Sequence, residues 1–190
     1  MPRRVHLHSW HIKHARMTNF AGFFMPLWYE GIVPEHLAVR NSVGVFDVTH
    51  MGRCIVQGED AERFLNYVTT NDVRKLKDLQ VQYTLMCNPR GGIKDDLTIC
   101  RLEPNRYWLV YNASNREKDF RWLVSHSEGF DVRLTDVSDE VVMLALQGPK
   151  AQQILEPLTP VDLRTIHRFH GQWVEPVSYT HLTLPTTERV

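Results

Sequence analysis

Two adjacent carboxylates, Asp95 and Asp96, follow a turn with the sequence Asn-Pro-Arg-Gly-Gly at positions 88–92. Runs of apolar and β-branched residues lie on both sides of this turn, at 81–87 and 93–102, so the segment predicts a β-hairpin. Because adjacent residues on a strand point to opposite faces, only one aspartate can face a core or pocket. One carboxylate is therefore a candidate for chemistry. The alternative is an acid at a loop end that solvates the turn or caps a neighbouring backbone group.

The composition is that of a globular protein. The 190 residues are 43% hydrophobic and 10% aromatic, which is enough for a substantial core. Lys+Arg and Asp+Glu balance at 22 each, which argues against nucleic acid or a membrane surface as the main partner. Cys54, Cys87 and Cys100 lack the spacing of metal ligands and predict buried free thiols in a reducing cytosol. Since no apolar stretch is long enough to span a bilayer, we expect a cytoplasmic protein.

Histidines are frequent near the N-terminus, and a further pair has i, i+3 spacing. These residues are His6, His8, His11, His14, His167 and His170. They could gather as metal ligands, but no acidic residue is suitably spaced to complete a site. Exposed histidines in a chain terminus are the alternative. We therefore predict no metal site.

The hydrophobic periodicity predicts an α+β fold, because helices and strands alternate irregularly and include a hairpin. One helix carries its apolar residues at 61, 64, 65 and 68. A second is indicated by Ser114 and Glu117, which have the spacing of a capping box, and a third by Pro149 at a first helical position. The remaining strand candidates are 54–57, 107–111, 130–134 and 141–147.

An internal similarity links residues 56–65 with residues 146–155. Gln, Gly, Ala and Leu recur at equivalent places, and each segment reads as a strand end, a glycine turn and a helix start. This pattern predicts duplicated ferredoxin-like strand-helix units, although shared turn chemistry is the alternative explanation.

The C-terminal segment 177–190 differs in character from the rest of the chain, with little charge and no clear period. Ten consecutive residues, 177–186, can be back-translated into a DNA string that resembles a transposase sequencing adapter. We therefore expect 177–190 to be an adapter-derived, non-native tail that follows the natural part of the chain, residues 1–176.

Several blocks, in order along the chain, resemble the glycine cleavage system T-protein family. They are Met25-Pro26, residues 35–40, residues 45–52, residues 70–73, Gly91-Gly92-Ile93 with Asp95-Asp96-Leu97, residues 116–119 and residues 146–149. The resemblance covers nearly everything from Ser9 to about Gly171. It implies that residues 1–176 are a partial folate-binding domain of a tetrahydrofolate-dependent aminomethyltransferase. We also expect a monomer. Such an enzyme moves a methylene group from an aminomethyl-lipoyl arm, carried by the lipoylated H-protein, to tetrahydrofolate and releases ammonia.

The resemblance also implies roles for particular residues. Asp95 matches the family's catalytic aspartate, whose charge would stabilise the cationic carbon as its leaving group departs and would orient the attacking amine. Met51, Tyr83, Ile99 and Asn112 would line the folate pocket together with Asp95, and Tyr83 would offer a flat surface to a ring. The alternatives are ordinary ones: core positions for Tyr83 and Ile99, gap filling for Met51, and backbone satisfaction for Asn112.

One expected block is missing. The family's Tyr-Thr-Gly-Glu motif, whose glutamate grips the pterin, should follow the region of His170, where the adapter-like tail begins instead. Three functions are therefore considered. They are the aminomethyltransferase, another folate-dependent member of the superfamily such as a demethylase or the folate domain of an oxidase, and a non-catalytic folate-binding module or truncated product.

Overall fold

The computed structural model describes residues 1–174, which divide into two compact units. Unit 1 contains residues 1–50, 141–165 and 173–174, and unit 2 contains residues 51–140 and 166–172. Residues 1–176 were expected to form one domain, and the predicted tail at 177–190 lies outside the described residues. Within the described part of the chain, no helix has the length and apolar character needed to cross a membrane.

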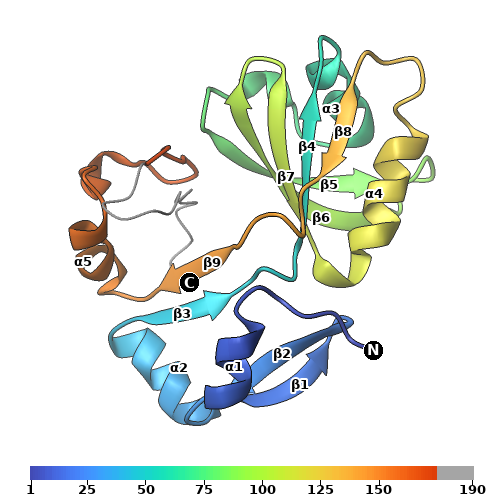
Figure 1. Ribbon diagram of the computed structural model, residues 1–190. Coiled ribbons are helices and arrows are strands. Elements are labelled where there is room, and N and C mark those ends of the chain that lie inside the picture. The colour runs from blue at the N-terminus through green and yellow to red at the C-terminus, as the bar shows by residue number, and fades with distance from the viewer. Residues whose placement is uncertain (175–190) are drawn as a thin grey trace. The chain divides into compact units, whose positions relative to one another are not determined.

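Unit 2 is built on a five-stranded antiparallel sheet in the order β5-β6-β7-β4-β8 (Figure 1). Its strands are β4 (Gly52–Gln57), β5 (Val81–Cys87), β6 (Ile93–Glu103), β7 (Arg106–Tyr111) and β8 (Arg133–Asp136). Strands β5 and β6 form the predicted hairpin. The Asn88 side chain closes its turn by accepting hydrogen bonds from the Arg90 and Gly92 backbone N–H groups, at 2.9 and 3.1 Å. Gly91 provides the left-handed backbone, with φ of 78°.

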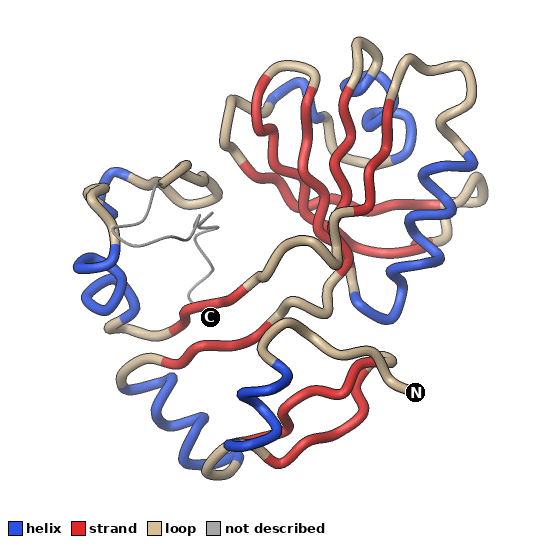
Figure 2. Tube along the Cα trace, viewed as in Figure 1, coloured by secondary structure: helices blue, strands red, loops and turns tan. Residues whose placement is uncertain are grey.

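Two helices, α3 (Ala61–Val68) and α4 (Arg116–Ser125), pack on one face of this sheet. The predicted apolar residues of α3 are all buried, and Leu123 of α4 joins the same core. From the sheet, this core receives Cys54, Val56, Met86, Leu97, Ile99, Tyr107, Leu109 and Tyr111. The opposite face of β5, β6 and β7 lacks helices in the described part of unit 2, which matches the alternation of buried and more exposed residues along these strands. Figure 2 shows the helices and strands by type.

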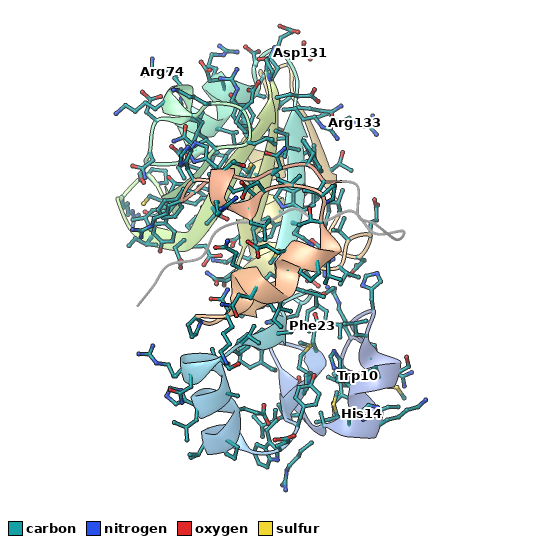
Figure 3. All side chains as sticks on the ribbon, turned by 90° about the vertical axis from the view of Figure 1, so that its left-hand side faces the viewer. Trp10, His14, Phe23, Arg74, Asp131 and Arg133 are labelled. Carbon is teal, nitrogen blue, oxygen red and sulfur yellow. The ribbon has the colours of Figure 1, made fainter. Side chains whose placement is uncertain are left out.

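Unit 1 contains two separate strand pairs, which are shown in red in the lower part of Figure 2. Strands β1 (Arg16–Phe20) and β2 (Phe23–Trp28) form a hairpin, and β3 (Gly44–Asp47) pairs with β9 (Leu144–Gln147). The helices are α1 (His8–His14), α2 (Ile32–Asn41) and α5 (Ala151–Leu155). Trp10 and His14, both labelled in Figure 3, lie on α1. Their rings stack with centroids 4.6 Å apart.

His11 takes part in a buried polar network of unit 1. Its Nε2 lies 2.8 Å from Asp47 Oδ2, and its Nδ1 lies 2.8 Å from the Tyr29 hydroxyl. Both ring nitrogens therefore have partners, which accounts for a histidine that is only 2% exposed. Among the described residues, His, Cys, Asp and Glu do not form a group of three that could hold a metal ion.

The internal similarity extends beyond the segments that suggested it. Gly58 and Gly148, 90 positions apart, both have left-handed backbones and lead into α3 and α5. The 3₁₀ turns η1 (Val73–Lys75) and η4 (Leu163–Thr165) repeat at the same offset. Each turn is preceded by an aspartate that binds an arginine two residues later, with Nε–Oδ1 distances of 2.8 and 2.9 Å. Duplicated strand-helix units are therefore visible in local conformation as well as in sequence.

Element boundaries differ from the prediction at several places. The third helix, α5, begins at Ala151, so Pro149 does not occupy its first helical position. The capping box at Ser114 is wrong, because the turn η2 (Ala113–Asn115) precedes α4 and no side chain caps that helix. The predicted strand at 130–134 begins later, at Arg133, because Phe130 packs edge-on against Phe64 of the core. The strand expected at 141–147 is shorter and begins at Leu144.

Candidate functional site

The open face of the sheet presents Tyr83 and Asp96 side by side. Tyr83 on β5 pairs with Thr98 on β6, and Asp96 lies two residues before Thr98 on the same face. The Tyr83 hydroxyl donates to Asp96 Oδ2 at 2.8 Å. Tyr83 is 52% exposed, so its ring is accessible to a partner. The hydrogen bond to Asp96, with smaller effects of burial and of both aspartate charges, raises the pKa of Tyr83 and keeps the phenol protonated.

Asp95 points the other way, into the face that the helices cover. It is 5% exposed and lies in strand alternation with the buried Leu97. Asn112, which follows β7, donates to Asp95 twice, from its backbone N at 3.2 Å and from its side-chain amide at 2.9 Å. Asn115 adds a third hydrogen bond, with its amide 2.8 Å from Asp95 Oδ1. This carboxylate is therefore largely saturated by groups of the protein itself.

Asn112 connects the two carboxylates. Its side-chain nitrogen lies 2.9 Å from Asp95 Oδ1 and 3.1 Å from Asp96 Oδ1, and it also approaches the Asp96 carbonyl oxygen at 3.2 Å. One amide group thus holds Asp95 on the buried face and Asp96 on the open face. Tyr83 and Asn112 contact Asp96 from its two sides, which leaves the Asp96 carboxylate oriented but exposed.

Asp119 on α4 adds a third carboxyl group behind Asp95. Burial, together with the hydrogen bond and charge of Asp95, raises the pKa of Asp119 to about 7. Burial also opposes ionisation of Asp95, but hydrogen bonds from Asp119, Asn112 and Asn115 outweigh it and keep the pKa of Asp95 below its ordinary value. Between pH 4 and 7 the pair therefore holds one proton, mainly on Asp119.

This pair predicts a distinct dependence of stability on pH. The folded chain keeps the Asp119 proton up to about pH 7, whereas the unfolded chain loses it near pH 4. Because the folded state binds more protons in this window, the free energy of unfolding should fall as the pH rises, by up to about 1.4 kcal/mol per pH unit. Urea unfolding of the wild type and of Asp119→Asn between pH 4.5 and 7.5 measures this slope. The variant should lack it, and equal slopes would contradict the assignment.

The other predicted site residues fall in different places. Ile99 is fully buried among the core residues on the helix-covered face, so the structure does not bring it beside Tyr83. Its neighbours Thr98 and Cys100 point to the open face and are partly exposed. Met51 directly precedes β4 and is partly exposed.

Strand alternation allows either aspartate to face the pocket, and the family resemblance implied Asp95. Asp96, Thr98 and Cys100 were therefore missed as residues of the open face. The amphipathic pattern of the helices could have identified these three residues. Because α3 and α4 are amphipathic and must cover one face, the strand residues that alternate with Leu97 and Ile99 remain on the other.

Comparisons with known proteins agree with this architecture. Residues 7–183 match the family model of the GCVT N-terminal domain. The aminomethyltransferase of Caldanaerobacter subterraneus is 49% identical over 156 residues, which are 82% of this chain and 42% of that protein. That of Thermosipho melanesiensis is 49% identical over 161 residues, 84% of this chain and 44% of that protein. The chain thus spans less than half the length of these curated relatives.

Two solved structures are also similar. The glycine cleavage system aminomethyltransferase T from Bartonella henselae superimposes with a TM-score of 0.85 at 36% identity, over 90% of this chain and 47% of that one. The heterotetrameric sarcosine oxidase from Corynebacterium sp. U-96 has a TM-score of 0.55 at 15% identity, over 76% and 72%, and is similar in fold alone. On the family match and the sequence identities, the chain belongs to the family of the GCVT N-terminal domain.

Proposed function

We propose that the chain is the N-terminal part of a tetrahydrofolate-dependent aminomethyltransferase of the glycine cleavage system. The full-length protein would take the methylene group from aminomethyl-lipoyl H-protein, pass it to tetrahydrofolate and release ammonia. Family membership and the names of the relatives support this activity. The observation that carries the proposal is the oriented Asp96 carboxylate beside the accessible ring of Tyr83.

We assign the reacting carboxylate to Asp96 and a supporting role to Asp95. Asp95 is the aspartate that the family resemblance indicated, and it is 5% exposed and already accepts three hydrogen bonds from Asn112 and Asn115. A substrate nitrogen would have to displace those donors to reach it. Asp96 is exposed on the open face and keeps lone pairs available beyond its bonds to Tyr83 and Asn112.

The open face has the chemistry needed to bind a folate. Tyr83 offers an aromatic surface with a polar end, and Thr98 and Val110 continue the same row across β6 and β7. Cys100 lies in the next row and would line the folate pocket in place of Ile99, which the family resemblance had implied. Bound tetrahydrofolate would supply the nitrogen nucleophiles that accept the one-carbon unit.

The chemical role of Asp96 follows from its charge and fixed orientation. Positive charge develops on the transferred carbon as its bond to the leaving group breaks, and a preorganised carboxylate stabilises that charge without reorganising. Tyr83 and Asn112 hold the carboxylate in place, so it can also orient an attacking N–H group. Asp95 and Asn112 support this arrangement from behind.

Tetrahydrofolate binding tests the assigned face. In the full-length protein, Tyr83→Leu should weaken tetrahydrofolate binding about 10-fold, as expected for the loss of one aromatic stacking surface. Tyr67→Leu is the matched control, because Tyr67 is also exposed, at 64%, but lies on α3 among Phe130 and His126. Isothermal titration calorimetry measures both affinities. Equal affinities for the two variants would remove Tyr83 from the site.

We also propose that residues 177–190 are read-through from a sequencing adapter and that the natural protein continues differently after about Pro176. The back-translated string supports this. Long-read sequencing of the source locus tests it: a frame that continues into a Tyr-Thr-Gly-Glu motif supports the proposal, and the present codons in the genome would refute it.

A further inference from the structure

Asp119 on α4 carries a carboxyl group that has no direct part in the proposed chemistry. Its side chain is fully buried. Lys118 Nζ lies 3.1 Å from its Oδ1, but among the described residues neither oxygen of Asp119 accepts a well-aligned hydrogen bond. A buried carboxylate without donors is costly, so a group in this position is stable only when it is protonated or paired.

Three charged or titratable side chains surround Asp119. Asp95 approaches it from β6, Tyr111 faces it from β7, and Lys118 adjoins it on α4 with Nζ 3.1 Å from Asp119 Oδ1. Lys118 is half exposed and also donates to the carbonyl oxygen of Lys94, so its charge is shared with solvent and backbone. The hydroxyl of Tyr111 has no hydrogen-bond partner among the described residues.

Arg116 is the other cation on this part of α4, but it is engaged elsewhere. Its two terminal nitrogens lie 3.0 and 2.8 Å from the carboxylate oxygens of Asp139, and it also faces Asp136 at 3.8 Å. Its charge is therefore compensated by two acids. Asp95 is therefore the carboxylate that interacts with Asp119 and can accept its proton.

Two carboxyl groups can hydrogen-bond to each other only when one of them carries a proton. Asp95 accepts hydrogen bonds from Asn112 and Asn115, which stabilise its anionic form, whereas Asp119 has no such donors. The proton therefore resides on Asp119, which donates it to Asp95. The resulting hydrogen-bonded chain runs from Asp119 through Asp95 and Asn112 to Asp96 and ends at Tyr83.

We propose that protonated Asp119 is a positioning residue, which holds Asp95 and Asn112 so that Asp96 is correctly oriented on the open face. The inference rests on the function proposed above, because Asp96 is the group it serves. When Asp119 loses its proton, two buried anions face each other and the Asn112 amide can no longer be held between Asp95 and Asp96. Deprotonation of Asp119 therefore switches off the orientation of Asp96 without changing any residue on the open face.

The test compares the pH dependence of kcat in the full-length protein and its variants. Asp119→Asn keeps a side-chain N–H donor for Asp95 at every pH, so its kcat at pH 6 should remain within about threefold of the wild type. Above neutral pH the kcat of the wild type should fall, whereas the pH profile of Asp119→Asn should show no such fall. Asp119→Leu removes the donor and should lower kcat about 10-fold at all pH values, with little change in the KM for tetrahydrofolate.

Two outcomes would overturn the proposal. One is an alkaline step of equal size in the wild type and in Asp119→Asn, and the other is a change confined to KM. If Asp119→Asn does not fold, carboxyl ¹³C chemical shifts of aspartate-labelled wild-type protein replace it, with one buried carboxyl expected to titrate near neutral pH. This titration is independent of turnover. If the protein lacks transfer activity but shows the titration, the proposed function is refuted and the proton shared by Asp119 and Asp95 is not. If the protein is active but does not show the titration, the positioning role of Asp119 is refuted.

Discussion

Replacing Asp96 by asparagine in the full-length protein is expected to lower kcat about 100- to 1000-fold, the effect of removing one preorganised electrostatic group from a reaction centre. Asn keeps the shape of the side chain and can still meet Tyr83 and Asn112 through its amide. The variant loses the negative charge that stabilises the cationic carbon. The KM for tetrahydrofolate should change little, because the ring of Tyr83 is untouched, and thermal denaturation should show an unchanged fold. Steady-state kinetics of methylene transfer measure the effect.

Glu103→Gln is the matched control for this prediction. Glu103 lies on the same strand as Asp96, is exposed and pairs with Arg106 at 3.0 Å, and it is outside the proposed site. Asp95→Asn provides the comparison that decides between the two aspartates and should cost less than Asp96→Asn, because Asp95 acts through Asn112. The reverse order, with Asp95→Asn the more damaging change, would return the reacting role to Asp95.

Gly52→Ala is expected to have a large effect on stability. Gly52 on β4 pairs with Tyr111 on β7, and the Tyr111 ring lies across it. A Cβ atom at position 52 would stand 2.1 Å from Tyr111 Cε2, and the ring is fully buried and cannot swing into solvent. We expect a loss of about 3 kcal/mol in the free energy of unfolding, which is typical of overpacking a close-packed core. Urea denaturation followed by circular dichroism measures this loss.

Two further variants isolate the cause. Gly91→Ala places a side chain at a left-handed position with φ of 78° and open space around it, so it should cost only about 1 kcal/mol from backbone strain. Tyr111→Leu removes the atoms that collide with a new Cβ, so the double variant should be more stable than the sum of the two single losses predicts. Strict additivity, or equal losses for Gly52→Ala and Gly91→Ala, would show that the Tyr111 ring is not the obstacle.

The hairpin that carries the site was predictable because its turn chemistry and strand alternation are local. The run from Asn88 to Gly92 specifies its own turn, and helix α3 follows from an apolar stripe of period 3.6. The local sequence does not decide which of Asp95 and Asp96 faces the open side of the sheet. It depends on which face α3 and α4 cover, and that is decided by tertiary packing that a strand pattern alone does not contain.

Tertiary contacts also explain one missed strand and the failed cap. Strand β3 has four residues and pairs with β9, roughly a hundred positions further along the chain. Ser114 and Glu117 have the spacing of a capping box, but the adjoining Asn115 turns its amide to Asp95, and the chain makes a 3₁₀ turn there instead of a capped helix start. The hydrogen bond that the buried Asp95 carboxylate requires therefore outweighs the local preference for a capped helix start.

The most direct test of the proposed activity is a reconstituted transfer assay with the full-length protein, aminomethylated H-protein and tetrahydrofolate. We predict that ammonia and methylene-tetrahydrofolate form in equal amounts and that both depend on the lipoyl group, with unlipoylated H-protein as the control. Ammonia release that is independent of tetrahydrofolate, or no transfer by a folded full-length protein, would contradict the proposed function.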